Sequence, residues 1–421
     1  MTERKIKMNK KRNISIKALF ALALVVIMSL GSLTTVFAAP GPISGGTQLS
    51  PAQAVIGKEL RMAEGTTTPA ATFTFQFAAK QYNDDNTTAT TAAMPAIADK
   101  SVTFASTDTG NTSLGLKTVT KDTASLFAGI TWPRAGIYTY TVTELSNTYT
   151  TNAGETMTYS TGSYDISIYV VNGNPNYIEG IGTYVVTPDH AGQTAGDKTD
   201  PQTSTVTGAP RAMVFTNTFT KMNGGTDVTD PSDQTLAISK MVAGAYGDQT
   251  KYFSYGVTVT QSVLSTGNTY KGYVVEGGNV VTAAANGTIA GTDPVNGNYI
   301  NFPSGTAVTV NLKHGQSLAF IDNEVGSSYV ANEAAAASYT PTASIIVNGG
   351  IPIALSSGEG TSLSTASRLI GENANSAAFT NTYKNVTPTG IALNNLPFIM
   401  IIVLAVGAFA AFIVVKSRKR A

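Results

Sequence analysis

Cysteine is absent from the 421 residues, and histidine occurs only twice, as His190 and His314. The absence of cysteine excludes disulfide bonds, thiolate metal sites and a cysteine nucleophile. Two histidines cannot supply a multi-histidine metal site. Charged residues make up 13% of the chain, about half of the roughly 25% in an average soluble domain. We therefore expect neither charge-driven disorder nor nucleic-acid binding, and we predict no metal or other cofactor.

The formal net charge of +1 hides an uneven distribution along the chain. Seven Lys or Arg and one Glu lie within residues 1–38, and four Lys or Arg with no acid follow Gly390. The remaining body holds 16 basic and 25 acidic residues, a net charge of −9. The two basic ends therefore differ in kind from the acidic body between them.

The N-terminus has the three parts of an export signal. A basic region at Arg4–Lys17 is followed by an apolar core at Ala18–Leu30, and Val36-Phe37-Ala38 is a small-residue cleavage pattern. The apolar core is too short to span a bilayer comfortably. We predict a signal peptide over residues 1–38 with cleavage after Ala38; the alternative is an uncleaved membrane anchor.

The C-terminus, residues 386–421, has a different layout. Residues 396–415 carry no charge and are long enough for a membrane helix, and four basic residues follow at once within 416–420. The body is therefore expected outside the cell. Pro388-Thr389-Gly390 stands just before the span, and this order resembles the wall-sorting signal of Gram-positive surface proteins, in a variant of its usual Leu-Pro-x-Thr-Gly form. A plain membrane anchor is the alternative.

The body shows short runs with a period of two residues, broken by Gly, Asn and Pro, which is typical of antiparallel strands and turns. The clearest runs are residues 73–77, 138–144, 163–171 and 252–259. No long stretch of the body has convincing helical periodicity. We predict an all-β body, most simply built from β-sandwiches.

The body also repeats itself. Each half opens with a Lys-containing apolar strand followed by an aromatic alternation, and each closes on Phe-Thr-Asn-Thr-aromatic. The matching segments are 55–60 with 237–242, 73–75 with 253–255, and 215–219 with 379–383. We predict two tandem domains, 40–222 and 235–385, joined by a linker over 223–234.

The linker carries three regularly spaced acids, Asp227, Asp230 and Asp233, among Gly and Pro. Carboxylates at such spacing can bind calcium. They also occur in ordinary acidic linkers exposed to solvent, and we favour that second interpretation.

Three polar residues in each half occupy positions that should face the core, because side chains two apart on a strand share a face. Lys58 lies between Ile56 and Leu60, and Asn217 lies between Phe215 and Phe219. Burying such groups is costly unless they are paired or neutralised. The complete sets are Lys58, Asn217 and Glu144 in the first half, and Lys240, Asn381 and Glu333 in the second.

One reaction uses these three residue types. Burial favours a neutral, nucleophilic lysine amine and a protonated glutamic acid. The amine can attack the asparagine carboxamide carbon while the acid polarises the carboxamide and transfers protons. Close placement supplies much of the rate. The product is a Lys–Asn isopeptide bond with loss of ammonia; the alternative is that these are ordinary ion-paired or edge residues.

With these motifs the body resembles the isopeptide-bonded, CnaB-type immunoglobulin-like domains of Gram-positive major pilins of the streptococcal kind. The resemblance implies two β-sandwiches of that type. It also implies the bonds Lys58–Asn217, assisted by Glu144, and Lys240–Asn381, assisted by Glu333. The segment before Glu333 lacks the full alternating aromatic pattern, so Glu324 is the second choice for that acid.

The resemblance further implies a backbone subunit of a surface pilus. A sortase thiol would attack the Thr389 carbonyl and release Gly390 onward. The acyl group would pass to a lysine of a neighbouring copy, or at the base to peptidoglycan or a basal pilin. Lys198 is the first candidate acceptor and Lys221 the second, and a tip adhesin is a further expected partner.

Two other classes of protein compete with a pilus subunit. A wall-anchored adhesin that never polymerises would share every feature except a usable acceptor lysine. A secreted enzyme is disfavoured, because the sequence contains no Gly-x-Ser-x-Gly or His-Glu-x-x-His motif. Autocatalytic crosslinking within the chain is the one chemical activity that we expect. The expected location is extracellular, in the wall or a pilus, after a transient stage in the membrane.

Overall fold

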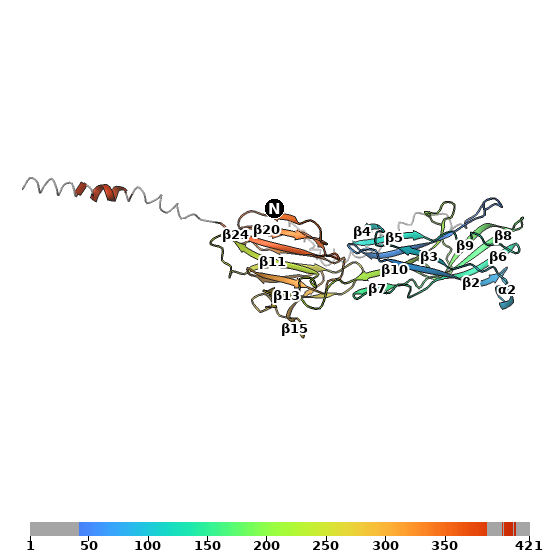
Figure 1. Cartoon of the computed structure of the whole chain (residues 1–421), viewed down its shortest axis with the longest axis horizontal. Coiled ribbons are helices and arrows are strands. Elements are labelled where there is room, and N and C mark those ends of the chain that lie inside the picture. The colour runs from blue at the N-terminus through green and yellow to red at the C-terminus, as the bar shows by residue number, and fades with distance from the viewer. Residues whose placement is uncertain (1–41, 385–397, 399, 407, 410–421) are drawn as a thin grey trace, which may run out of the picture.

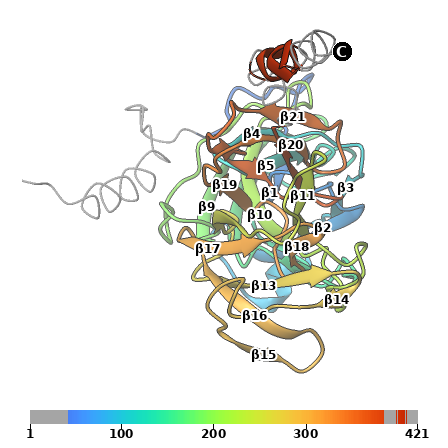
Figure 2. The ribbon, with the colours of Figure 1, turned by 90° about the vertical axis from the view of Figure 1, so that its left-hand side faces the viewer.

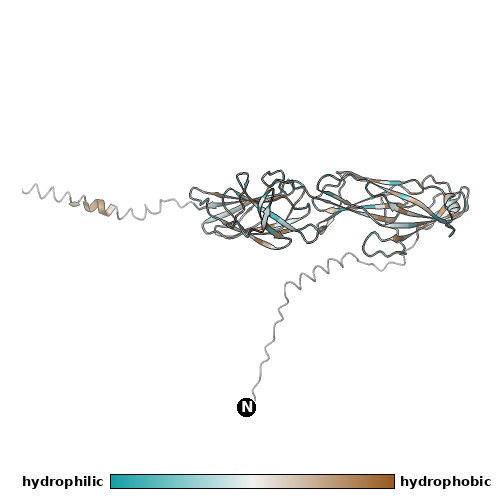
Figure 3. Cartoon of the chain, turned by 90° about the horizontal axis from the view of Figure 1, so that it is seen from below, coloured by the Kyte–Doolittle hydropathy of each residue, from teal (hydrophilic) through white to brown (hydrophobic). Residues whose placement is uncertain are grey.

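The computed structural model describes residues 42–384, 398, 400–406 and 408–409. The predicted signal peptide (1–38), the Pro388-Thr389-Gly390 segment and much of the predicted span at 396–415 lie outside these residues. The described part of that span is helical and hydrophobic (Figure 3). Among the described residues, no helix is both long and apolar enough to cross a membrane.

The regular secondary structure of the described body is almost all β-strand, as the alternating sequence pattern predicts. It forms two sets of sheets that lie end to end along the long axis (Figure 1). We call the sheets within residues 55–221 the first domain and those within 236–383 the second domain. All named strands and all buried clusters lie inside 42–384.

The first domain contains ten strands and one short helix. They are β1 (Val55–Ala63), β2 (Ala71–Tyr82), α2 (Thr88–Ala92), β3 (Lys100–Phe104), β4 (Asn111–Ser113), β5 (Leu116–Asp122), β6 (Gly136–Glu144), β7 (Glu155–Thr158), β8 (Ser163–Val171), β9 (Tyr177–Thr187) and β10 (Arg211–Lys221). One sheet has the order β4-β5-β1-β10-β7 and the other β3-β2-β6-β8-β9. The first and last strands, β1 and β10, are parallel neighbours.

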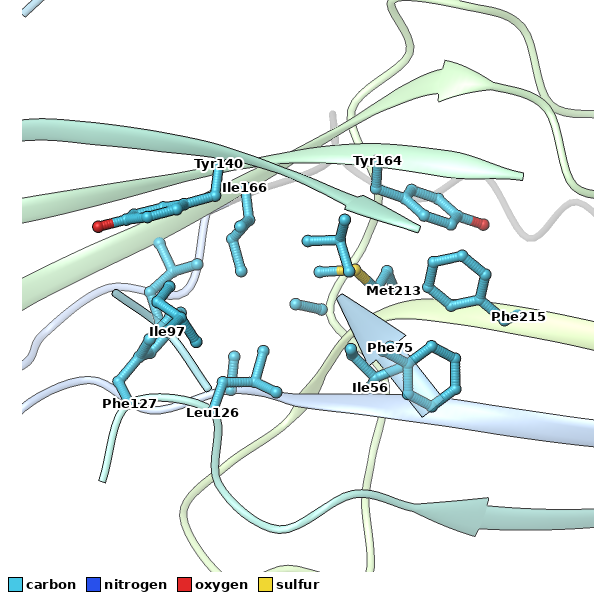
Figure 4. Packing of buried hydrophobic residues seen from close by; sticks show 14 of the residues in the cluster. Ile56, Phe75, Ile97, Leu126, Phe127, Tyr140, Tyr164, Ile166, Met213 and Phe215 are labelled. Atoms are coloured by element: carbon cyan, nitrogen blue, oxygen red, sulfur yellow. The ribbon is translucent and has the colours of Figure 1, made fainter. Parts of the chain in front are cut away.

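Apolar side chains from both sheets of the first domain meet in one core. Alternating β-branched and aromatic residues favour strands and put one face of each strand inside. Ile56 of β1 and Phe215 of β10 are fully buried, as are Phe75 of β2 and Tyr164 of β8. Figure 4 shows these side chains packed together. The core therefore holds the faces of β1 and β10 against the opposite sheet.

The second domain contains fourteen strands. They are β11 (Leu236–Ala243), β12 (Phe253–Thr260), β13 (Thr269–Glu276), β14 (Asn279–Val280), β15 (Gly291–Asp293), β16 (Gly297–Pro303), β17 (Ala307–Leu312), β18 (Gln316–Phe320), β19 (Ser328–Glu333), β20 (Tyr339–Ile346), β21 (Ile353–Ser356), β22 (Leu363–Ser364), β23 (Arg368–Leu369) and β24 (Ser376–Tyr383). The larger sheet has the order β15-β16-β13-β18-β11-β24-β20-β21, with β14 beside β13. The smaller has the order β17-β12-β19-β22, with β23 beside β19.

The second domain keeps the central feature of the first and enlarges the sheet around it. Its first and last strands, β11 and β24, are again parallel neighbours. The strands β13 to β16 extend the larger sheet to one side, and β15 lies at its outer edge (Figure 2). A second core is built mainly from buried aliphatic and aromatic residues of both sheets, including Ile238, Val257, Phe302 and Phe379.

The two domains contact each other around the end of β10. The Val325 amide donates to the Lys221 carbonyl at 2.9 Å, and the Thr67 amide donates to Glu372 Oε1 at 2.9 Å. Gly326 has a φ of +90°, and a Cβ there would lie 2.2 Å from the Cβ of Ala63. Only glycine fits both the left-handed backbone and the close approach.

The aspartates of the predicted linker accept hydrogen bonds from main-chain amides of their own loop. Asp233 accepts the amides of Thr226 and Asp227, each at 2.9 Å, and Asp230 accepts the Ser232 amide at 2.8 Å. Within residues 42–384 and the described helical residues, no group of three or more His, Cys, Asp or Glu is arranged to hold a metal ion. The three acids act here as turn-stabilising acceptors.

Candidate functional site: two buried Lys–Glu–Asn sets

Lys58 and Asn217 lie side by side on the parallel strands β1 and β10. Lys58 pairs with Phe215 in the strand register, and Leu60 pairs with Asn217. Two residues along a strand return to the same face, so both polar side chains point into the space between the sheets. The alternation that buries Ile56, Leu60, Phe215 and Phe219 therefore also buries Lys58 and Asn217.

Glu144 reaches the same point from the opposite sheet. It is the last residue of β6 and pairs with Phe75 of β2. Lys58 Nζ donates to Glu144 Oε2 at 2.6 Å, and Asn217 Nδ2 donates to Glu144 Oε1 at 2.6 Å. The carboxyl group thus bridges the amine and the carboxamide.

The second domain repeats this arrangement at each position. Lys240 of β11 pairs with Phe379 of β24, Asn381 pairs with Val242, and Glu333 of β19 pairs with Tyr255 of β12. Lys240 Nζ lies 2.5 Å and Asn381 Nδ2 lies 2.7 Å from Glu333 Oε1. The structure therefore brings together both predicted sets of three residues.

An aromatic ring at a matching position lies close to each amine. Lys58 Nζ lies 4.9 Å from the ring centroid of Phe73, and Lys240 Nζ lies 4.0 Å from that of Phe253. These rings occupy matching positions on β2 and β12. In the sequence the aromatic alternations indicate the repeat, and their position after each lysine strand is the signal for this second role.

Both sets are shielded from solvent. Lys58 and Asn217 are 0% exposed, and Lys240, Glu333 and Asn381 are each 1% exposed. The side chain of Glu144 is also 0% exposed. An ionised pair at such sites loses its hydration, so its charged form is disfavoured.

The pKa values move in the directions that this burial requires. Desolvation lowers the pKa of Lys58 to about 8, although the Glu144 carboxyl acts in the opposite direction. Desolvation likewise lowers the pKa of Lys240 to about 8 against the attraction of Glu333. Burial raises the pKa of both glutamates, opposed by the neighbouring lysines. Both shifts favour a neutral amine beside a protonated acid.

Glu324, the second choice for the acid of the second domain, lies elsewhere. Its Oε1 accepts hydrogen bonds from the Ser262 amide at 3.0 Å and from the Tyr270 hydroxyl at 2.9 Å. Glu324 therefore stabilises the loop before β13 and the β13 strand, whereas Glu333 contacts both Lys240 and Asn381.

The two candidate acceptor lysines have different surroundings, and neither joins the buried sets. Lys198 is exposed and forms an isolated bridge with Tyr184, with its Nζ 5.8 Å from the Tyr184 ring centroid. Lys221 lies at the domain junction, with its Nζ 3.5 Å from Glu372 and 3.8 Å from Glu155. Thr389 and Gly390, the predicted sortase residues, lie outside the described residues.

The two halves of the body match two different family models. Residues 55–220 match the model of the Spy0128-like isopeptide containing domain, and residues 234–383 match that of a domain of unknown function. The first match confirms the predicted resemblance to the isopeptide-containing domain family of Gram-positive pilins. A search of curated protein sequences gave no match.

Solved structures of pilus proteins are also similar to this chain, at low identity. The major pilin from Streptococcus pyogenes is 18% identical, with a TM-score of 0.30, over 79% of this chain and 99% of that one. The T-13 major pilin of the same species is 19% identical, with a TM-score of 0.29, over 82% and 100%. The pilus-presented adhesin Spy0125 is 18% identical, with a TM-score of 0.23, over 53% and 37%.

Proposed function

We propose that this chain is the structural backbone subunit of a sortase-assembled, covalently polymerised surface pilus. In this proposal its body is two CnaB-type immunoglobulin-like domains, within 40–222 and 235–385, each closed by a self-generated isopeptide bond. The observation that carries the proposal is the matched pair of buried sets, which occupy the same strand register in both domains. The family match of residues 55–220 supports it.

The reaction within the first set balances without any added reagent. The neutral Lys58 amine attacks Asn217 Cγ, so the Nζ–Cγ bond forms and the carbonyl electrons move to Oδ1. Collapse of that intermediate breaks the Cγ–Nδ2 bond. Glu144 gives its proton to Nδ2 and takes one from Nζ, so ammonia leaves and the acid is regenerated. Lys240, Asn381 and Glu333 follow the same steps. No external substrate takes part, so the chain is not an enzyme in the usual sense.

Crosslinking should have a bell-shaped pH dependence. The reactive form of each Lys–Glu pair holds one shared proton, so the rate reports the two pKa values of the pair. At a pH above both pKa values, that of Lys58 being about 8, the amine is neutral, its partner is ionised and the departing nitrogen lacks a proton. Below the raised pKa of Glu144 the amine is protonated and unreactive. We expect a plateau between these limits.

The measurement is the mass of residues 40–385 during refolding. The chain would be isolated in denaturant before it has folded, diluted into buffers of different pH, and sampled for loss of ammonia. The fluorescence of Trp132, which is 4% exposed in the first core, would confirm folding at each pH. A rate that climbs steadily beyond pH 10 would contradict the shared-proton mechanism.

The positions of Lys198 and β24 support head-to-tail assembly. β24 runs away from the first domain and ends at the far end of the second, ahead of the predicted Thr389 linkage (Figure 1). Lys198 precedes Thr199, whose hydroxyl donates to the Ala212 carbonyl near the start of β10. Because β10 ends at the domain junction, Lys198 lies toward the opposite end of the first domain. Linkage points at opposite halves of a rod give an open filament.

Replacing Lys198 tests this assembly. With the cognate sortases present, wild-type chain should give a denaturant-resistant ladder on a gel, and Lys198→Ala should give monomer that is still attached to the wall. Lys80→Ala is the matched control, because Lys80 is another exposed lysine of the first domain and should leave the ladder intact. If Lys198→Ala still gives a ladder, Lys198 is not the acceptor, and Lys221→Ala is the next variant to test. A wild-type chain without a ladder would favour a wall-anchored adhesin.

A further inference from the structure

The two sites differ at the glutamate, since Glu333 Oε2 is buried without a hydrogen-bond partner, whereas both oxygens of Glu144 accept. They differ also at the side-chain oxygen of the asparagine, the atom that takes up charge in the proposed reaction. Asn217 Oδ1 accepts a hydrogen bond from the main-chain amide of Ser160 at 2.7 Å. In the described part of the second domain, Asn381 Oδ1 is buried and has no hydrogen-bond partner. The carboxamide of the first site is therefore held at both its nitrogen and its oxygen.

Strand length explains this difference. β7 pairs with β10 only as far as Thr158, opposite Thr218. The chain then leaves the sheet, so the Ser160 amide can turn toward the side chain of Asn217. In the second domain β20 continues along β24 and places Pro341 opposite Asn381. Proline has no N–H to donate, and Thr342, the counterpart of Ser160, stays in the strand opposite Thr380.

A buried carboxylate outside the crosslinking set fixes the position of Ser160. The side chain of Asp189 is 0% exposed. It accepts a hydrogen bond from the Ser160 hydroxyl on Oδ1 and another from the Thr216 amide on Oδ2 at 2.9 Å. Thr216 directly precedes Asn217. Asp189 therefore ties the loop that carries the donor to the strand that carries the acceptor.

We propose that the Ser160 amide is an oxyanion donor of the first site, positioned by Asp189, and that the first crosslink consequently forms faster than the second. The inference rests on the proposed isopeptide chemistry. When Lys58 Nζ bonds to Asn217 Cγ, the carbonyl electrons move to Oδ1, and the amide already points at that oxygen. Such a donor stabilises the developing charge without reorganisation, most strongly where water is excluded.

The test compares the two sites in separate single-crosslink chains. Lys240→Ala leaves only the first site active and Lys58→Ala only the second. Mass spectrometry would follow the loss of ammonia over time once refolding is complete. Trp132 fluorescence would show the end of refolding in the Lys240→Ala chain, and circular dichroism would show it in the Lys58→Ala chain. We expect the first site to react faster, and Ser160→Pro, which removes the N–H, to slow it by about 10²-fold or more.

Three further variants separate positioning from general damage to the fold. Asp189→Asn and Ser160→Ala should each slow the first site, whereas Ser160→Thr keeps both the hydroxyl and the amide and should restore the wild-type rate. None of the three should change the second site in the Lys58→Ala chain. If Ser160→Pro does not fold, the crosslinking rate of the first site in Asp189→Asn is compared with that in Ser160→Thr. A slower rate in Asp189→Asn supports the positioning role.

Two outcomes would overturn the inference. One is a folded Ser160→Pro or Asp189→Asn chain that crosslinks its first site at the wild-type rate. The other is a first site that reacts no faster than the second in otherwise unchanged chains. A chain that loses no ammonia at either site would instead refute the proposed isopeptide chemistry, so the two failures are distinguishable.

Discussion

Purified residues 40–385 should be lighter than their sequence by the mass of two ammonia molecules. Each buried set holds an amine and a carboxamide on one carboxyl group, with distances of 2.5 to 2.7 Å, and condensation of each pair releases one ammonia. Lys58→Ala or Asn217→Ala should restore the mass of one, and Lys240→Ala or Asn381→Ala that of the other. Intact-mass spectrometry measures each change directly.

Lys121→Ala is the matched control for this experiment. Lys121 lies opposite Lys58 on the neighbouring strand β5, but its Nζ pairs with Asp108 at 2.6 Å. It should therefore have no part in the reaction, and its variant should still lose two ammonias. A wild-type mass equal to that of the unmodified sequence would exclude both crosslinks.

Glu144→Ala should yield a folded but uncrosslinked first domain. The acid transfers protons without being consumed, so its loss blocks the reaction while Lys58 and Asn217 remain. The missing bond would have closed a loop from residue 58 to residue 217. The chain-entropy model for crosslinks gives a loss of up to about 5 kcal/mol in the free energy of unfolding for a loop of this order.

Denaturant unfolding followed by Trp132 fluorescence would measure this loss, because that single tryptophan lies in the first core. Asn217→Ala is the comparison, since it removes the same bond and keeps Glu144 beside Lys58. The two variants should lose similar stability, and Glu333→Ala should leave the Trp132 transition nearly unchanged. Normal ammonia loss at the first site of Glu144→Ala would exclude Glu144 from the mechanism.

The strands that carry the site were predictable from the sequence because strand alternation is a local property. The run 163–171 coincides with β8, and 138–144 falls within β6. The lysines and asparagines lie between two apolar neighbours on one face, and each glutamate follows such residues at the end of its strand. The repeat strengthens the prediction, since chance alone seldom places three such residues in the same order twice.

Features that depend on where a strand ends could not be predicted from the alternation of residues in the sequence. The sequence favours Glu333 over Glu324 only weakly, because the segment at 326–333 lacks a full alternation; the contacts of Glu333 with Lys240 and Asn381 distinguish the two acids. Ser160 and Asp189 lie in connections, where no periodicity applies. Their roles follow from the end of β7 at Thr158 and from a contact across the fold.

In the proposed fibre, the parallel contact between β11 and β24 determines how tension would pass through the second domain. Load that enters the second domain at β11 must leave it through β24, and these strands are adjacent. A covalent Lys240–Asn381 bond would carry the tension directly from one strand to the other. The residues between them, including the enlarged sheet of β13 to β16, would then bear almost none of it. Insertions and sequence changes in that sheet would alter the surface of the fibre without lowering its tensile strength.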